Sequence, residues 1–240
     1  MIEWLRETNR DPVIEISGRT LPIELRRHAT AKRLTLRLAP DGSAVRITLP
    51  RWTASKEAVN FAHSRAEWLA QQLAKVPQQR DPVAENRLDY RGQALAIAWA
   101  ADTPRKARAD DGVLHIGGPR DTLHRRLHRW LEAEAIQLFE KDAAFYCERA
   151  GLAPAPVRLT RAKRRWGSCS SGGMLRLNWR LVQAPDHVRR SVVAHEVAHL
   201  VHFDHSPAFH SLLDRIFEGE IEEANRWLTQ HGRTLYTSFG

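Results

Sequence analysis

Two histidines and one glutamate have the types and the spacing that metal-dependent hydrolysis needs. His195 and His199 are four residues apart in the segment HEVAH, and Glu196 directly follows the first of them. An α-helix turns once every 3.6 residues, so both imidazoles would lie on one helix face and bind a single tetrahedral zinc ion. Glu196 would project beside them. The segment therefore predicts a zinc site built on a helix.

A third zinc ligand has to come from beyond this helix, because successive helical residues climb about 1.5 Å each and do not all converge on one ion. His202 would lie about 10 Å along the axis from His195, so we expect it at the helix end or in solvent. His205 precedes Ser206 and Pro207, which are typical of a helix N-cap and first helical position. We expect the chain to turn there and bring His205 back to the zinc.

Three protein ligands leave the fourth zinc position open for water, which is typical of catalytic rather than structural sites. Glu196 would take a proton from this water as it attacks a carbonyl carbon, and would later deliver it to the leaving amine. Tyr236 and His210 are candidates for stabilising the oxyanion. In an alternative ligand set, a downstream glutamate replaces His205. The candidates for it are Glu218, Glu220, Glu222 and Glu223.

The residues around this motif predict the elements that would position it. The active-site helix should begin at Asp186, whose carboxylate would accept bonds from the first free backbone amides. Upstream, residues 157–160 and 175–179 are predicted strands, and the Gly/Ser-rich stretch 167–173 is a predicted turn between them. The edge of this strand–loop–strand unit could receive an extended peptide by backbone pairing.

Apolar residues at three- and four-residue steps predict two further helices. One covers residues 53–76, and the other covers 121–145 and closes at Gly151. We expect the second to pack on the active-site helix. Its His124 and His128 share one face, but the arginines around them repel a cation. We therefore interpret this pair as an exposed basic surface.

Alternating apolar residues predict a β-rich first half. Residues 34–38 and 45–49 should form a hairpin, because Asp41-Gly42 supplies the turn between them. Pro22 favours an edge position for its own strand, because proline donates no ladder hydrogen bond. Further short strands are expected at 14–16, 21–25, 95–99 and 113–116.

Two stretches, 77–87 and 101–111, lack apolar periodicity and are predicted loops. The whole pattern predicts an α+β fold. We expect residues 1–118 to form a β-rich N-terminal region with one long helix, and residues 119–240 to form the catalytic region.

Composition describes an ordinary globular chain of 240 residues, with 42% hydrophobic and 27% charged residues. The N-terminal segment meets Glu3 and Arg6 before any apolar run, and no run of about 18 apolar residues occurs, so we expect a cytoplasmic protein. Cys147 and Cys169 are too few for a disulfide framework and are interpreted as reduced.

A net charge of +9 favours acidic partners, with nucleic acid first among them. A cluster that contains no acidic residue precedes the active-site helix, so a positive field should lie beside the cleft. The cationic residues proposed for nucleic-acid contact are Arg158, Arg161, Lys163, Arg164 and Arg165. The neighbouring Trp166 and Trp179 are interpreted as core residues rather than substrate contacts.

The runs RRWGSCSSGGMLRLNWRLVQAP and VVAHEVAHLVHFDHSPAF closely resemble the YgjP-like metallopeptidase family over residues 161–215. The resemblance implies a zincin-like fold for the catalytic region, zinc on His195, His199 and His205, and catalysis by Glu196. The ligand spacing is also similar to that of SprT and Spartan-type proteases, which cut proteins crosslinked to DNA. A glycine is usual at the position of His202 in metzincins, so the chain departs from their pattern.

Three functions follow from these patterns. The first is a zinc metallopeptidase that hydrolyses peptide or protein substrates. The second is a DNA-associated protease, whose basic surface binds phosphate while the zinc site cuts bound protein. The third is a binding module without enzymatic activity, in which zinc is only structural. An intact Glu196 and an open fourth position favour the enzymes.

Overall fold

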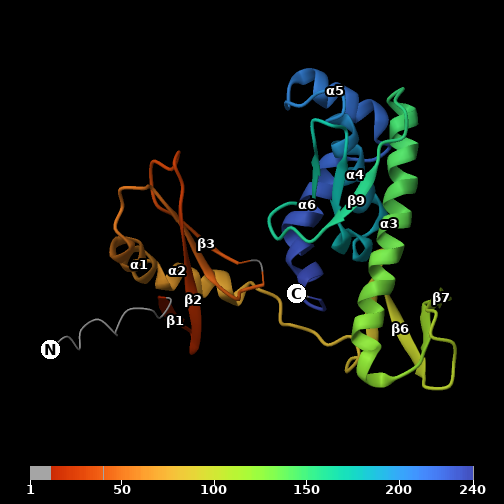
Figure 1. Cartoon of the computed structure of the whole chain (residues 1–240), viewed down its shortest axis with the longest axis horizontal. Helices are drawn as coiled ribbons and strands as arrows, with labels where there is room; N and C mark the ends of the chain where they lie inside the picture. Colours follow the sequence, from red (N-terminus) through yellow and green to blue (C-terminus); the bar gives the residue numbers. More distant parts are fainter. Residues whose placement is uncertain (1–11, 40, 240) are drawn as a thin grey trace. The chain divides into compact units, whose positions relative to one another are not determined.

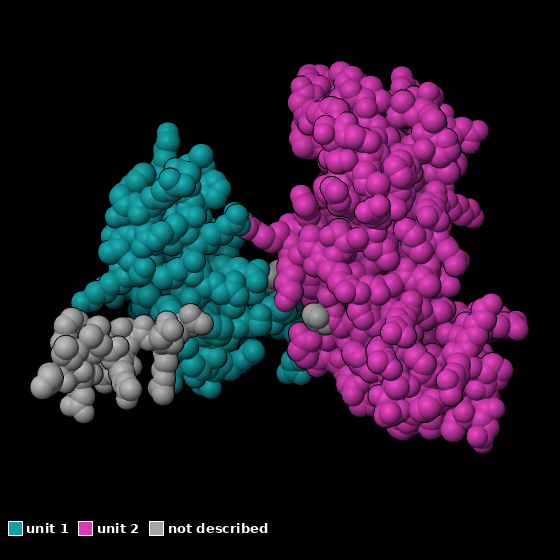
Figure 2. All heavy atoms as spheres, in the orientation of Figure 1, with its two compact units in different colours: residues 1–78 teal, residues 79–240 magenta. Residues whose placement is uncertain are grey.

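The computed structural model describes residues 12–39 and 41–239. It confirms the α+β fold and divides the chain into two compact units, Met1–Gln78 and Gln79–Gly240, which Figure 2 colours separately. The N-terminal segment with Glu3 and Arg6, on which the expectation of a cytoplasmic protein partly depends, lies outside the described residues.

The first unit is a mixed four-stranded sheet with two helices packed on one face. The expected hairpin is confirmed, since β3 and β4 pair antiparallel from Thr35↔Thr48 to Leu38↔Val45. The sheet order is β1-β2-β4-β3, and apolar strand residues pack against apolar helix residues in one core. The elements are β1 (Val13–Ile16), β2 (Arg19–Arg27), β3 (Thr35–Leu38), β4 (Val45–Leu49), α1 (Ser55–Ser64) and α2 (Ala66–Ala74).

Two expectations for this unit are wrong. The helix predicted over 53–76 is interrupted at Arg65, whose backbone (φ −111°, ψ 15°) leaves the helical region between α1 and α2. Pro22 lies on β2, which is an interior strand. It is tolerated there because the parallel pairing of β2 with β4 begins only at Ile23, so the missing N–H falls outside that ladder.

The second unit begins with another four-stranded sheet, of order β5-β6-β8-β7. Its inward residues, among them Leu95, Ile97 and Leu114, join the main core of the unit. The stretch 101–111, predicted to be a loop, contains the short edge strand β7, and the edge strand β5 begins where the other predicted loop ends. The apolar pattern indicates neither strand because their residues are mostly polar. The strands are β5 (Arg87–Tyr90), β6 (Gln93–Ala100), β7 (Arg108–Asp110) and β8 (Val113–Gly117).

A 27-residue helix, α3 (Leu123–Arg149), runs along the whole second unit (Figure 1). The short 3₁₀ turn η1 (Arg120–Thr122) precedes it, and Gly151 follows its last turn with φ +71°. Leu123, Leu127 and Leu131 share one core with the β5–β8 sheet. The unit boundary therefore lies at 78/79 rather than at the expected 118/119, because that sheet packs on the helix that follows it.

The remaining elements form a three-stranded sheet of order β10-β11-β9 and a group of helices. The Gly/Ser stretch expected as a turn includes a strand, β10, which pairs antiparallel with β11 from Gly167↔Leu177 to Cys169↔Leu175. Because β10 pairs on one side only, it is an edge. The elements are β9 (Val157–Thr160), β10 (Gly167–Cys169), β11 (Leu175–Asn178), η2 (Trp179–Gln183), α4 (Asp186–Ala198), α5 (Pro207–Ile216), α6 (Ile221–His231) and η3 (Gly232–Tyr236).

The structure also bears on several smaller expectations. Cys147 and Cys169 are both free thiols. His128 is not an exposed basic residue: its ring stacks on Phe239 and lies 4.5 Å from that of Trp179, and burial lowers its pKa. Among the described helices, none has the length and apolar content that a membrane span requires.

Candidate metal centre

The helix that carries the HEVAH segment is held between other parts of the second unit. α4 begins at Asp186 as expected, but the Asp186 carboxylate does not cap it, because Arg91 and Arg189 occupy its oxygens. Arg189 also donates to buried Asp142 of α3 at 2.8 Å. The expected contact of α3 with the active-site helix is thereby confirmed, and it includes a buried ion pair.

The structure brings the three candidate zinc ligands together. His195 and His199 approach each other at their Nε2 atoms, 3.1 Å apart, and the Nε2 atom of His205 lies 3.4 Å from that of His195. One nitrogen from each ring lies within 4.8 Å of the other two. Tetrahedral zinc with Zn–N bonds of about 2.0–2.1 Å places its ligand nitrogens about 3.3–3.4 Å apart. The donor set therefore fits a zinc ion.

The chain between the second and third histidines reverses as the sequence predicts. Ser206 caps α5 by accepting a bond from the Phe209 amide at 3.4 Å, and Pro207 occupies the first turn. The Phe209 ring then packs against the imidazoles of His195, His199 and His205, with centroid distances of 5.0, 4.6 and 4.9 Å. Contacts with this one apolar ring thus restrict the orientations of all three imidazoles.

His202 contributes its backbone rather than its ring. Its carbonyl oxygen lies 2.9 Å from Nδ1 of His199, which would donate to it and leave Nε2 free for a metal. Burial lowers the pKa of His195 to about 4, and the neighbouring histidines lower it further. The ring is therefore neutral at physiological pH, as metal ligation requires.

Glu196 is 6% exposed and lies against the edge strand β10. A Cβ atom built on Gly167 would lie 2.6 Å from the Glu196 Cγ atom, so only glycine leaves room for this carboxylate. Burial raises the pKa of Glu196 to about 7, while the positive charge of Arg165 and a bond from the Cys169 backbone N–H oppose the rise. This carboxyl is therefore poised to exchange protons near neutral pH.

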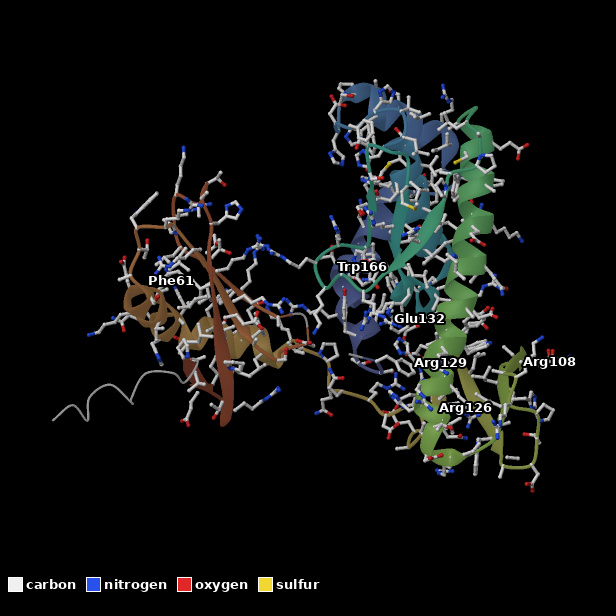
Figure 3. The ribbon with its side chains drawn as sticks, viewed as in Figure 1. Phe61, Arg108, Arg126, Arg129, Glu132 and Trp166 are labelled. Carbon is white, nitrogen blue, oxygen red and sulfur yellow. The ribbon has the colours of Figure 1, made fainter. Side chains whose placement is uncertain are left out.

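A cavity of about 200 Å³ opens beside His195 and Glu196. Its walls combine polar and apolar side chains and come from β10, α4 and α6. Trp166, on the loop before β10, forms one wall (Figure 3). The remaining walls include Val192, Ile221 and Leu228, with Asn225 and Ser191 as polar groups. The sequence reasoning missed the α6 residues, although the spacing of Ile221, Ala224 and Leu228 is helical.

Other candidates from the sequence lie elsewhere. Glu218 accepts from Tyr146 at 2.9 Å and pairs with Arg190, and no glutamate joins the histidine cluster in the described part of the chain. Tyr236 is buried, with its hydroxyl 3.4 Å from the carbonyl oxygen of Ala162. Trp179 is fully buried, as expected for a core residue, whereas half-buried Trp166 lines the cavity.

The residues of the basic cluster before β10 differ in whether a carboxylate pairs with them. Arg161 donates to Glu132 of α3 at 2.8 Å, so its charge is partly neutralised (Figure 3 labels Glu132). Arg165 is exposed, and its charge acts on Glu196, which places it beside the cleft. Arg158 and Arg164 are exposed. The positive charge of the cluster therefore acts at the candidate site, through Arg165.

A family model described as a YgjP-like metallopeptidase domain matches residues 32–231. This is most of the chain, and the chain therefore belongs to the YgjP-like family of metallopeptidase domains. Among solved structures, it is similar to the metallopeptidase zymogen abylysin of Pyrococcus abyssi, with 24% identity and a TM-score of 0.35 over 41% of this chain and 96% of that one. No curated protein matches the chain significantly.

Proposed function

We propose that this chain is a zinc-dependent peptidase in which His195, His199 and His205 hold the ion and Glu196 is the general base. The observation that carries the proposal is one cluster: three imidazoles whose nitrogens lie within 4.8 Å of one another, with a buried carboxylate beside them. Membership in a metallopeptidase family supports the same chemistry. Zinc is favoured over harder cations because all three donors are imidazole nitrogens.

A zinc ion bound there would supply Lewis-acid activation of water and of the scissile carbonyl group. The chain's own part is proton transfer. Glu196 takes a proton from the attacking water at its carboxylate and returns it to the leaving amine. The Cys169 amide and Arg165 stabilise the ionised form of Glu196, and burial keeps the carboxyl basic enough to accept the proton.

The substrate would bind as an extended strand. β10 presents a free edge next to Glu196, so a peptide backbone can add to the sheet there. One of its side chains would then enter the cavity of about 200 Å³ beside the base. The apolar part of the cavity is formed by Trp166, Val192, Ile221 and Leu228, so we expect an aliphatic side chain at the position that enters it.

The test uses the purified full chain, zinc analysis by mass spectrometry and hydrolysis of casein or a fluorogenic peptide. Glu196→Gln should keep zinc and lose activity by about 10²–10⁴-fold, because the ligands stay while the base is gone. His205→Ala should lose both. Glu222→Ala, on the exposed side of α6, is the matched control and should keep both. Full activity of Glu196→Gln, or zinc retention by His205→Ala, would contradict the proposal.

Two alternatives have their own tests. A binding module without activity is excluded by casein cleavage that chelator abolishes and zinc restores. A DNA-associated protease acting through Arg158, Arg161, Lys163, Arg164 and Arg165 requires DNA affinity that falls as salt rises. The exposure of Arg158 and Arg164 favours it. The cytoplasmic location stays a prediction.

A further inference from the structure

The first unit carries a second basic surface, far in sequence from the candidate metal centre. From residue 25 to residue 56 the chain has a single acidic residue, Asp41. The same stretch has eight lysines and arginines, namely Arg26, Arg27, Lys32, Arg33, Arg37, Arg46, Arg51 and Lys56. This excess of charge falls on β2, β3, β4, the loops at their ends and the first turn of α1.

The strand registers place part of this charge on the open face of the sheet. Ile23, Val45 and Ile47 point into the core with the helices, so the residues that alternate with them point to the other face. Arg37 lies opposite Arg46 across β3 and β4. Arg26 lies beside them on β2, opposite Thr48. Three guanidinium groups thus occupy neighbouring strands of one face.

Most of this charge is not neutralised locally. Arg46 pairs with Glu24 at 2.6 Å. Arg26 and Arg37 are exposed, and neither has a carboxylate partner among residues 12–39 and 41–239. These two free guanidinium groups lie on one face of the sheet, on the strands β2 and β3 that flank β4. They form a binding surface for phosphates along an extended chain rather than for a single small anion.

An exposed aromatic ring belongs to the same stretch. Trp52 follows β4 and is 74% exposed, which is unusual for a side chain of its size. Its backbone is fixed from both sides, because the Arg27 guanidinium donates to the carbonyl oxygens of Arg51 at 3.0 Å and of Thr53 at 2.6 Å. The fixed backbone limits the ordering that is needed when a flat ligand stacks on the exposed ring.

We propose that residues 25–56 form a binding surface for single-stranded nucleic acid, with phosphates on Arg26 and Arg37 and a base stacked on Trp52. Cationic side chains that follow a backbone, combined with an aromatic ring that stacks on any base, are the two components of such sites. A duplex would not use the ring, because its bases are already stacked. The inference is independent of the proposed peptidase activity.

The experiment measures the affinity of the full chain for a fluorescent 20-nucleotide oligothymidylate across a range of salt concentrations. Each lost phosphate contact on a single strand reduces the slope of log K against log salt by about 0.7. The double variant Arg26→Gln/Arg37→Gln should therefore bind more weakly, with a slope smaller by about 1.4. Trp52→Ala should lose about tenfold in affinity and keep the slope, because stacking releases no counterions.

The matched control is Arg65→Gln/Lys75→Gln, which removes the same charge from the exposed ends of α1 and α2 and should leave both affinity and slope unchanged. Three results with nucleic acid would overturn the proposal. They are no binding at low salt, an equal loss in the control, and duplex binding as tight as single-strand binding with no effect of Trp52→Ala. Tighter binding to vesicles that contain anionic lipid than to the oligonucleotide would also overturn it.

Discussion

The Glu196 carboxylate lies directly over the Cα atom of Gly167, in the space that any side chain at that position would fill. This contact joins the active-site helix to the edge strand, so the base and the expected substrate strand have a fixed separation. It explains why the motif WGSC has a glycine as the first residue of β10.

Gly167→Ala should therefore lower peptidase activity without removing the metal. The added methyl group would lie 2.6–2.7 Å from Glu196 side-chain carbons and would push the carboxylate aside. A displacement of about 1 Å costs about 10²-fold in rate. Gly172→Ala is the control, because its Cβ would meet no atom within 4 Å. Hydrolysis and zinc content of both variants check the prediction, and equal activities would refute it.

The cavity beside Glu196 should control substrate preference. Leu228→Phe replaces an aliphatic side chain of the cavity wall with a larger aromatic one. This leaves less room for an aliphatic side chain of the substrate. We expect kcat/KM for a peptide with leucine at that position to fall about tenfold relative to one with alanine. Arg226→Ala, an exposed change on the same helix, should leave this ratio unaltered. Cleavage of the two matched peptides measures it, and an unchanged ratio in Leu228→Phe would show that the cavity is not used.

The buried pair of Asp142 and Arg189 should be a major determinant of stability in the second unit. Asp142→Ala removes the buried one of the two carboxylates that pair with Arg189 and leaves it with half-exposed Asp186, and breaking a buried pair costs about 3–5 kcal/mol. Asp110→Ala breaks an exposed pair with Arg108 and should change stability by less than about 1 kcal/mol. Urea unfolding of the two variants tests this. A similar midpoint for both would mean that the buried pair is not important.

Stability should also depend on Asp186 at acidic pH. Burial alone would raise the pKa of Asp186, but bonds from Arg91 and the charge of Arg189 outweigh it and hold the pKa below its usual value. Its contribution is then fully present above about pH 4 and is lost as the pH falls through the lowered pKa. The difference in urea midpoint between the parent chain and Asp186→Asn should be largest near pH 6 and shrink toward pH 3. A difference that does not change with pH would contradict this.

The sequence predicted the parts of this molecule that depend on local spacing. The helical period brings His195 and His199 together, and the N-cap signal of Ser206 and Pro207 accounts for the turn before α5. Long apolar periodicity likewise predicted α3. Each of these features is determined by residues within a few turns of one another.

What the sequence did not predict depends on contacts between distant segments. Asp186 pairs with Arg91, 95 residues away, instead of capping its helix. Pro22 lies on an interior strand because of where a parallel neighbour begins. β5, β7 and β10 have three or four residues each and no clear alternation. The cavity combines Trp166 with residues of α6, and no local pattern links them.

The contacts at the start of α3 determine where this chain can be truncated. Residues Leu123, Leu127 and Leu131 are covered by strands that precede them in the chain, including Leu95 and Leu114. A fragment that starts at residue 119 would leave this apolar stripe bare and would aggregate during expression. A fragment that starts at residue 79 retains the strands that cover this apolar stripe. The smallest version of this enzyme that stays in solution therefore includes a sheet that contributes no side chain to the three-histidine cluster.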